Sequence, residues 1–264
     1  MRDYSPLDRP ADRPRLSLRR FLRPIRADRR FMQTAIHRGL SAVVMGLAGF
    51  VALSLVLVGL FAIAPVPVTP LAGIRAIEAG FGGRPVYFSK DWVSIDRMPP
   101  SLLRAAIASE DFRFIEHHGF DFDAIQKAMK ANERVEKRGR GKIRGASTIT
   151  QQTAKNVFLW PSRTWVRKGL EVWFTLLIEM TWSKRRILEV YLNVIEFGDG
   201  VYGAEAASRR FFRKPAKNLT SAESALLIAV LPNPRKLRVD QPSSYVRYRQ
   251  NSILRRLSYV DLPE

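Results

Sequence analysis

Two adjacent acids, Glu110 and Asp111, stand in the stretch ASEDFRFIEHHGFD, where an apolar run ends and aromatic residues and histidines begin. A glutamate at the carboxyl end of a partly apolar helix is poorly hydrated and faces the negative end of the helix dipole, which makes it a better proton acceptor. An exposed acid pair that marks a helix end would give the same local pattern. We take Glu110 as a candidate general base and His117 as a hydrogen-bonding brace beside a tight turn.

A second polar stretch, GASTITQQTAKNVFL, occupies residues 145–159. If Ser147 opens a helix there, Thr148, Gln152 and Lys155 come at i, i+4 and i+7 and share one face. That face then carries hydroxyl, amide and ammonium groups behind a glycine-rich cationic loop. Such a set of hydrogen-bonding groups suits a sugar phosphate, although a polar helix face is usually just solvated.

Three charged residues, Arg167, Lys168 and Glu171, open a strongly apolar helical segment. Arg167 and Glu171 are spaced as an i, i+4 surface ion pair, which would stabilise a helix by about 0.3–0.5 kcal/mol. Two cations beside a carboxylate at the mouth of a buried helix are equally suited to holding a pyrophosphate. A zinc site is not expected, because no second histidine or glutamate stands at metal-ligand spacing.

Taken together, these stretches resemble the glycosyltransferase domain of the peptidoglycan glycosyltransferases, a family that includes class A penicillin-binding proteins and monofunctional biosynthetic transglycosylases. The resemblance covers about residues 85–235. It is carried by the patterns E-D-x-x-F-x-x-H-x-G from Glu110, G-x-S-T-I-T-Q-Q with K-N from Gly145, R-K-x-x-E from Arg167, and K-x-x-I-L-E-x-Y-L-N from Lys184. The chain departs from the family at Phe211, where a tyrosine is expected, and at Arg213, where glycine is common.

The resemblance implies a mainly α, lysozyme-like fold and an inverting reaction that polymerises lipid II, a disaccharide-pentapeptide on undecaprenyl pyrophosphate, into glycan strands. It assigns catalysis to Glu110, which takes the proton of the acceptor hydroxyl, and to Glu171, which orients the cations or holds Mg²⁺ or Mn²⁺ at the pyrophosphate. The residues expected to bind substrate are Ser147, Thr148, Gln152, Lys155, Asn156, Arg167 and Lys168. The nearest alternative is a membrane-anchored, lysozyme-like muramidase that hydrolyses finished glycan with Glu110 as its acid.

The elements that must position these residues are predicted to be mainly helices. Their expected ranges are 101–112, 121–133, 147–159, 165–181, 184–196, 202–212, 220–230 and 243–259. The helix from 220 begins with a capping box, in which Thr220 and Glu223 cap each other's backbone groups. A short extended segment is predicted at 85–96, and a mobile loop at 136–145, where glycine alternates with cations.

An uncharged segment, residues 41–64, is predicted to cross a membrane, because it would reach about 36 Å as a helix. It is too long for the apolar core of a secretory signal peptide. Arginines dominate the residues before it, so the positive-inside rule places the amino terminus in the cytoplasm and the rest outside. The expected parts are a basic cytoplasmic arm (1–40), a transmembrane helix (41–64), a juxtamembrane linker (65–84) and the glycosyltransferase domain (85–264).

The formal net charge of +20 predicts an anionic partner. A basic module that holds nucleic acid or anionic lipid is a rival reading, but the outward orientation of the domain excludes cytoplasmic nucleic acid. The expected partners are therefore lipid II, the growing glycan strand and the bacterial inner membrane, with cell-wall synthesis proteins as further possibilities. The absence of cysteine excludes disulfides and a cysteine nucleophile.

One apolar set near the acids is suited either to core packing or to a face that dips into the membrane interface. Its members are Phe112, Phe114, Phe120, Phe122, Ile125 and Met129.

Overall fold

The computed structural model describes residues 29–81, 88–139, 141, 145–162 and 164–264 of the 264-residue chain. The chain divides into two units, Met1–Val51 and Ala52–Glu264. In the first unit, residues 1–28 of the expected basic arm lie outside the described residues. The described remainder of that unit belongs to helix α1 (Arg29–Ile63), which continues into the second unit.

Helix α1 contains the expected membrane-spanning segment. Its stretch Ile36–Ile63 is 28 residues long and has a mean hydropathy of 2.6, and it is the one span of this kind among the described residues. A helix of that length reaches about 42 Å, more than the roughly 30 Å of a hydrocarbon core. The helix begins earlier than the predicted residue 41, so residues 29–40 of the arm are helical.

The predicted juxtamembrane linker at 65–84 is partly wrong, because helix α2 (Pro70–Phe81) lies within it. Proline is favoured in the first turn of a helix, where its missing N–H group is not needed. The hydroxyl of Thr69, the residue before it, accepts a hydrogen bond from the backbone N–H of Ala72 at 3.2 Å. The pair Thr69-Pro70 is thus the start signal of a helix within the predicted linker.

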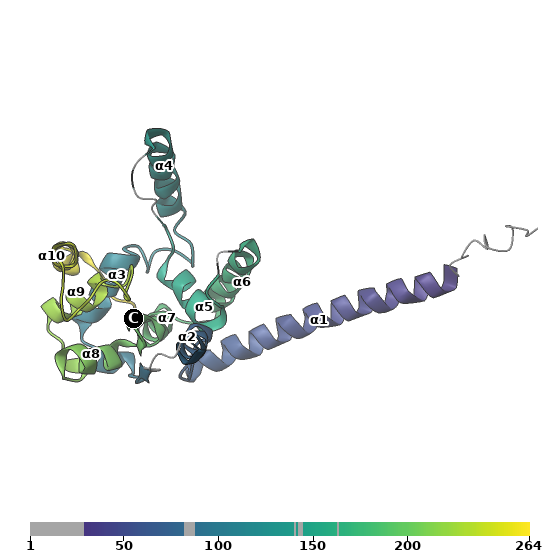
Figure 1. Cartoon of the computed structure of the whole chain (residues 1–264), viewed down its shortest axis with the longest axis horizontal. Helices are drawn as coiled ribbons and strands as arrows, with labels where there is room; N and C mark the ends of the chain where they lie inside the picture. The colour runs from purple at the N-terminus through teal and green to yellow at the C-terminus, as the bar shows by residue number, and fades with distance from the viewer. Residues whose placement is uncertain (1–28, 82–87, 140, 142–144, 163) are drawn as a thin grey trace, which may run out of the picture. The chain divides into compact units, whose positions relative to one another are not determined.

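The second unit is mainly helical, as predicted (Figure 1). Its other helices are α3 (Pro100–Glu110), α4 (Phe122–Arg138), α5 (Ile149–Phe158), α6 (Trp165–Thr181), α7 (Lys184–Val194), α8 (Ala204–Phe212), α9 (Ser221–Ala229) and α10 (Ser244–Leu254). The capping box at Thr220 is confirmed. The helix predicted to run to residue 259 ends instead at Leu254 and is followed by a separate 3-10 turn, Leu257–Tyr259.

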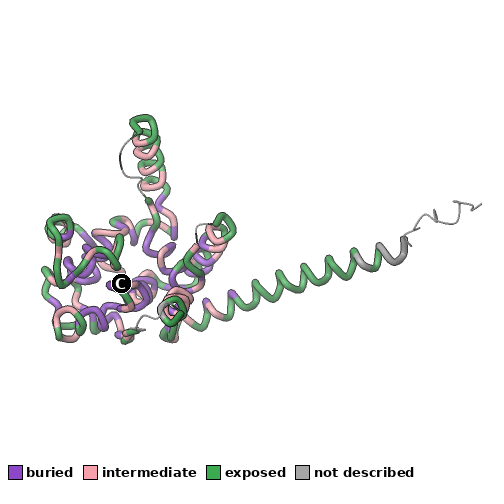
Figure 2. Tube along the Cα trace, in the orientation of Figure 1, coloured by how far each residue is buried: buried purple, intermediate pink, exposed green. Residues whose placement is uncertain are grey.

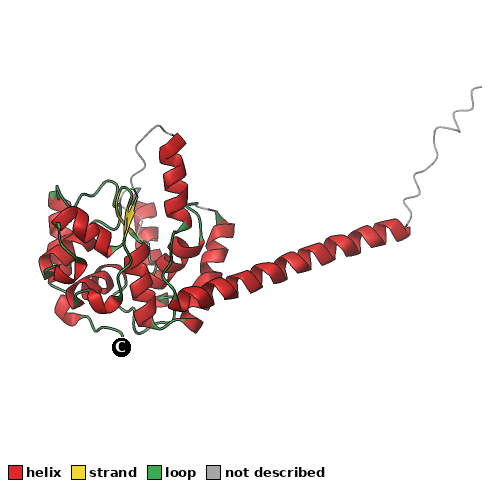
Figure 3. Ribbon diagram, turned by 90° about the horizontal axis from the view of Figure 1, so that it is seen from below, coloured by secondary structure: helices red, strands yellow, loops and turns green. Residues whose placement is uncertain are grey.

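Three short strands accompany the helices (Figure 3): β1 (Ser89–Lys90), β2 (Glu196–Gly198) and β3 (Val201–Tyr202). They form one sheet in the order β1-β3-β2, with β1 parallel and β2 antiparallel to β3. The extended segment predicted at 85–96 is confirmed only at β1, and residues 82–87 lie outside the described part of the chain. Strands β2 and β3 take the places where the helices 184–196 and 202–212 were predicted to end and begin.

The hydrophobic core lies within two groups of helices. Helix α9 packs against α3 and α10, and α5 packs against α6 and α7. Figure 2 shows buried residues running through both groups. Leu102 and Ile107 of α3, Ile149 of α5 and Ile178 of α6 are at most 1% exposed. Because α3 belongs to the first group and α5 to the second, the two acids at the end of α3 lie where the groups meet.

Helix α4 does not contribute to this core, because none of its residues is buried and it extends away from the packed helices (Figure 1). Asp121 caps its first turn, and Gly139 ends it with a φ of 63°. The loop predicted at 136–145 is helical to residue 138, and residues 140 and 142–144 lie outside the described part of the chain.

The expected apolar set near the acids is divided by the structure. Phe114 is fully buried, so the core-packing alternative holds for this residue. Phe122, Ile125 and Met129 follow one another at i, i+3 and i+7 along α4, and the exposed fractions of Phe122 and Met129 are 75% and 59%. Phe112, before α4, is also half exposed.

Arg213, which stands where glycine is common in the family, adopts an unfavourable backbone conformation. Arg213 ends α8 in the left-handed conformation, with φ 57° and ψ 32°, and it is the one non-glycine residue with positive φ among the described residues. This conformation costs a residue with a Cβ atom roughly 1–2 kcal/mol, whereas glycine adopts it freely.

We expect Arg213→Gly to stabilise the protein by about 0.5–1 kcal/mol, since relief of the strain exceeds the extra freedom that glycine has in the unfolded chain. Thermal unfolding of the detergent-solubilised protein measures the effect. Arg213→Lys is the matched control, because it retains the Cβ atom and the charge and should leave the stability unchanged. Equal midpoints for Arg213→Gly and wild type would contradict the prediction.

Candidate active site

Asp111 ties the end of α3 to the beginning of α5. Its Oδ2 accepts a hydrogen bond from the backbone N–H of Ile149 at 2.9 Å, and its Oδ1 lies 2.8 Å from Nε2 of His117. Asp111 is 8% exposed. A carboxylate is stabilised at the amino end of a helix by free N–H groups and by the helix dipole. Asp111 therefore has a structural role, and the predicted bracing role of His117 is confirmed.

The glycine of the same motif is required by its conformation and by close packing. Gly119 has a φ of 82°, and a Cβ atom there would lie 2.8 Å from Cγ2 of Thr175 and 2.9 Å from Cγ of Glu179. Its carbonyl oxygen accepts a hydrogen bond of 2.7 Å from the hydroxyl of Thr148. The turn is held from the other side by Lys184, whose ammonium donates to the His117 carbonyl oxygen at 2.6 Å.

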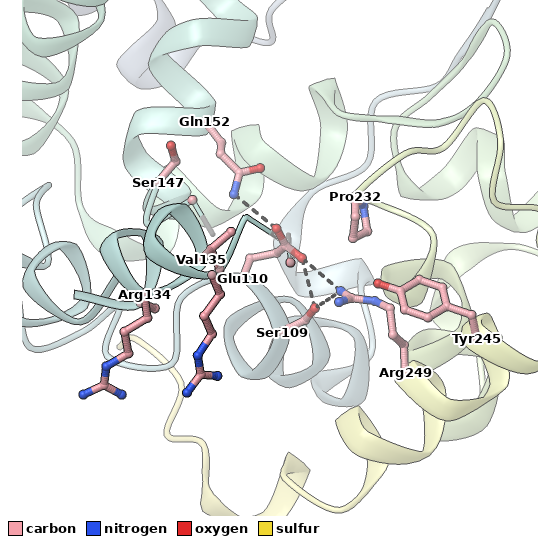
Figure 4. Close-up of a pocket in the computed structure, with 13 residues that line it drawn as sticks. Ser109, Glu110, Arg134, Val135, Ser147, Gln152, Pro232, Tyr245 and Arg249 are labelled. Atoms are coloured by element: carbon pink, nitrogen blue, oxygen red, sulfur yellow. Dashed lines mark hydrogen bonds and ion pairs between the residues drawn. The ribbon is translucent and has the colours of Figure 1, made fainter. Parts of the chain in front are cut away.

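Glu110, the last residue of α3, turns its carboxylate into a cleft (Figure 4). Oε1 accepts a hydrogen bond of 2.9 Å from the hydroxyl of Ser109, and Oε2 accepts one of 3.2 Å from Nε2 of Gln152. The guanidinium of Arg249 in α10 lies 3.7 Å from Oε1. The side chain remains 15% exposed, so a ligand in the cleft can reach it. These contacts fix the carboxylate in a position from which it can accept a proton.

The cleft has a volume of about 1070 Å³ and continues into a smaller hollow of about 440 Å³. Glu110, Gly145 and Ser147 line both spaces. Helix α4 contributes one wall of each, and Tyr245 and Arg249 contribute to the opposite wall of the larger one. The larger volume is at the upper end of small-molecule sites, and it suits an extended ligand such as an oligosaccharide.

Tyr191 and Gln152 form a second layer behind Glu110. Tyr191 is fully buried, and burial, with smaller contributions from the charges of Glu110 and Asp111, raises its pKa well above the usual range. Its phenol therefore stays protonated and donates to Oε1 of Gln152 at 3.4 Å. This contact turns the NH₂ group of the Gln152 amide towards Glu110.

A group of cations lies further along α5 and at the beginning of α6. The carboxylate of Glu171, which is 3% exposed, accepts a hydrogen bond of 2.6 Å from Arg167 and one of 2.5 Å from Lys168. Lys155 is exposed, yet protein atoms crowd its ammonium group. This desolvation lowers the pKa of Lys155, and nearby Arg167 and Lys168 lower it further, against the opposing effect of Glu171. Two cations thus contact one carboxylate and a third, Lys155, lies within electrostatic range of them, a set that can bind a multiply charged anion.

Comparison with known proteins identifies the family to which this chain belongs. The family model described as transglycosylase matches residues 82–258. The chain belongs to the transglycosylase family.

Among its relatives, the biosynthetic peptidoglycan transglycosylase of Bdellovibrio bacteriovorus is 56% identical over 205 residues, which are 78% of this chain and 80% of the relative. The proteins of the same name from Shigella boydii and Escherichia coli are each 55% identical over 201 residues, or 76% of this chain and 81% of the relative.

Membership of the transglycosylase family confirms the resemblance drawn from the four motifs, and with it the lysozyme-like fold. It makes the chain a glycosyltransferase, and neither comparison favours the hydrolytic alternative. In this transglycosylase, the residues singled out from the sequence fall into two places. Ser147 and Gln152 lie in the cleft with Glu110, whereas Lys155 and Asn156 line a separate hollow of about 410 Å³ beside Trp160.

The predicted start of α5 needs correction. The helix begins at Ile149 rather than Ser147, because Thr148 is its N-cap and forms a capping box with Gln151. Thr148 is 2% exposed. Its hydroxyl accepts a hydrogen bond from the Gln151 N–H and donates one to the Gly119 carbonyl oxygen, so it has no free hydrogen to donate to a substrate. Thr148 thus stabilises the helix, and it also lines the smaller hollow beside Glu110.

The sequence analysis gave no role in the site to Ser109, Tyr191 or Arg249. Ser109 and Tyr191 stand within motifs that were already noted, and a buried tyrosine usually has a partner for its hydroxyl. Arg249 gave no local signal, since it lies in a helix rich in arginine and meets Glu110 and Ser109 across about 140 residues of chain.

The adjacent acids should differ in their effect on stability. We expect Asp111→Ala to destabilise the protein by about 2–4 kcal/mol, because it leaves the Ile149 N–H and His117 without a partner in a buried place. Glu110→Ala should change the stability by less than about 1 kcal/mol. Denaturant unfolding of the two variants in detergent makes the comparison, and equal losses would contradict this division of roles.

Proposed function

We propose that this transglycosylase polymerises lipid II into the glycan strands of peptidoglycan and releases undecaprenyl pyrophosphate. The observation that supports this substrate is the arrangement along α5. Gln152 contacts the acid in the cleft, and Lys155, one turn later, is within electrostatic range of Glu171, Arg167 and Lys168. The residue that holds the proton acceptor and a cation for the anion thus lie one turn apart on the same helix. The relatives named biosynthetic peptidoglycan transglycosylase support the same assignment.

Glu110 serves as the general base in this proposal. The attacking hydroxyl of a sugar has a pKa far above 7, so it needs a positioned proton acceptor, which typically contributes a factor of about 10²–10⁴ in rate. The acceptor oxygen forms a bond to the anomeric carbon of the donor while its proton passes to Glu110. Ser109, Gln152 and Arg249 hold the carboxylate in place during this step.

The cations act on the leaving group. When the bond between the anomeric carbon and the pyrophosphate oxygen breaks, negative charge develops on the pyrophosphate. Lys155, Arg167 and Lys168 offset this charge, and fixed cations in a poorly hydrated site are effective because they need no reorganisation. Direct displacement inverts the anomeric centre and forms no covalent glycosyl-enzyme.

Glu171 orients the cations rather than the substrate, because both of its oxygens are occupied by Arg167 and Lys168. The alternative, a divalent ion held by Glu171, fits this geometry poorly. No group of three potential metal ligands occurs among the residues that the structure describes. We therefore assign no step to Mg²⁺ or Mn²⁺.

The proposed location is the bacterial inner membrane, with α1 as a single anchor, the amino terminus in the cytoplasm and the catalytic domain outside. Helix α1 is long and apolar enough for this purpose, and the arginines before it support the orientation. Phe122 and Met129 are exposed along one face of α4 and can enter the membrane interface. Lipid II keeps its tail in the bilayer, so a site close to the membrane suits this substrate, and other cell-wall synthesis proteins are plausible neighbours there.

We expect Glu110→Gln to abolish polymerisation, because the amide cannot accept the proton, while stability and lipid II binding are retained. The assay supplies purified lipid II to the detergent-solubilised protein and follows the formation of glycan strands. Retention of more than about a tenth of the wild-type rate would remove Glu110 from the base role.

We expect Lys155→Ala to lower kcat about tenfold or more at saturating lipid II, since a cation that acts on developing charge contributes mainly in the transition state. Lys236→Ala removes the same charge from an exposed place outside the cleft and is the matched control. An unchanged kcat for Lys155→Ala would show that this residue does not act on the pyrophosphate.

A further inference from the structure

Several positively charged side chains lie on the face of α4 that lines the cleft and the smaller hollow. Lys127, Ala131, Arg134 and Arg138 follow at i, i+4, i+7 and i+11, so they share one side of the helix. Arg134 and Arg138 line the larger cleft with Glu110, and Lys127 lines the smaller hollow that opens from it. The exposed apolar residues of α4 lie on a different side. We call Lys127, Arg134 and Arg138 the α4 cation row.

Within the described part of the chain, the α4 cation row has no acidic partner. Among the described residues, none of its members takes part in an ion pair, whereas Arg113, just before α4, is paired with Glu116 and Asp123. Arg134 and Arg138 are also one turn apart, and like charges at that spacing destabilise a helix by about 0.2–0.5 kcal/mol. The helix thus keeps an unfavourable charge pair beside the reaction centre, where an anionic ligand would offset it.

The row faces a space large enough for a substrate. Figure 4 shows Arg134 on one side of Glu110, with Tyr245 and Arg249 on the other. The cleft of about 1070 Å³ between these walls exceeds what a single sugar needs. The pyrophosphate that leaves already has Lys155, Arg167 and Lys168, which line neither of the two spaces beside α4. An anion bound at the α4 cation row is therefore a different group of the substrates from the departing pyrophosphate.

We propose that the α4 cation row binds an anionic group of the lipid II molecule whose hydroxyl attacks, either a carboxylate of its peptide stem or its own pyrophosphate. This inference rests on the proposed function. Both groups are multiply hydrogen-bonding anions, and arginine binds either with two parallel N–H groups. The row positions the acceptor so that its hydroxyl reaches Glu110.

The test compares two double variants of the full chain. Arg134→Gln with Arg138→Gln removes two charges from the row, and Lys130→Gln with Lys137→Gln removes two charges from the same helix outside the cleft. All four residues are exposed and glutamine is a good helix former, so both variants should fold. Equilibrium binding of a short-chain lipid II to each protein is measured first, and steady-state polymerisation second.

We expect the row variant to weaken lipid II binding and raise KM about three- to tenfold, with kcat within about twofold of wild type, because exposed charge contacts are individually modest. The control should stay within about twofold of wild type. Equal effects in the two variants, or no effect in either, would overturn the proposal.

A lipid II with an amidated peptide stem separates the two sources of the anion. If the ligand is a stem carboxylate, wild type binds this substrate as weakly as the row variant does, and the variant loses nothing more. If the ligand is the pyrophosphate, the difference between wild type and variant persists. The binding measurement does not depend on turnover, so a wild type that binds lipid II but does not polymerise it contradicts the proposed function alone.

Discussion

The site depends on the hydrogen bond from the Ile149 N–H to Asp111. It joins the end of α3 to the beginning of α5, and these helices belong to different packed groups. A buried carboxylate without partners is costly, but here the helix end and His117 both satisfy it. Because Glu110 immediately precedes Asp111, the same bond sets the distance between the Glu110 carboxylate and the Gln152 amide. Most residues of the first two motifs therefore hold one another in place, and few of them face the cleft.

The cations around α5 and α6 are only partly neutralised by the one carboxylate that they contact. Arg167 and Lys168 both donate to a single buried carboxylate, Glu171, which orders them. Desolvation lowers the pKa of Lys155, so its charged form is less favourable without a partner than it would be in water. An anionic group bound beside Lys155 would offset this penalty.

Much of the fold could be predicted from local sequence because helices are defined by short-range signals. Periodicity placed the helical segments, and the capping box at Thr220 marked one boundary correctly. The same T-x-x-Q signature was present at Thr148 and Gln151, so the error at the start of α5 could have been avoided. The helix start at Thr69-Pro70 was likewise readable.

The remaining features depend on contacts between distant parts of the chain. Arg249 is recognised only through its approach to Glu110, and the burial of Phe114 only through the packed turn, where the ammonium of Lys184 lies 4.7 Å from the centre of its ring. Hydrophobicity alone could not tell this phenylalanine from the exposed Phe122. Local patterns thus identify which residues are unusual, and the tertiary structure decides which of them meet a ligand.

The last turns of α1 are built into the catalytic domain. Val58 is 1% exposed, its carbonyl oxygen accepts from the indole of Trp182, and Arg186 donates to the carbonyl oxygens of Phe61 and Ala64. A cation at the carboxyl end of a helix satisfies groups that would otherwise lack partners. These last turns of α1 are therefore packed within the same unit as the catalytic helices. Cutting the chain at the nominal membrane boundary would expose an apolar patch and strip two side chains of their acceptors, so a soluble form requires a redesigned surface there.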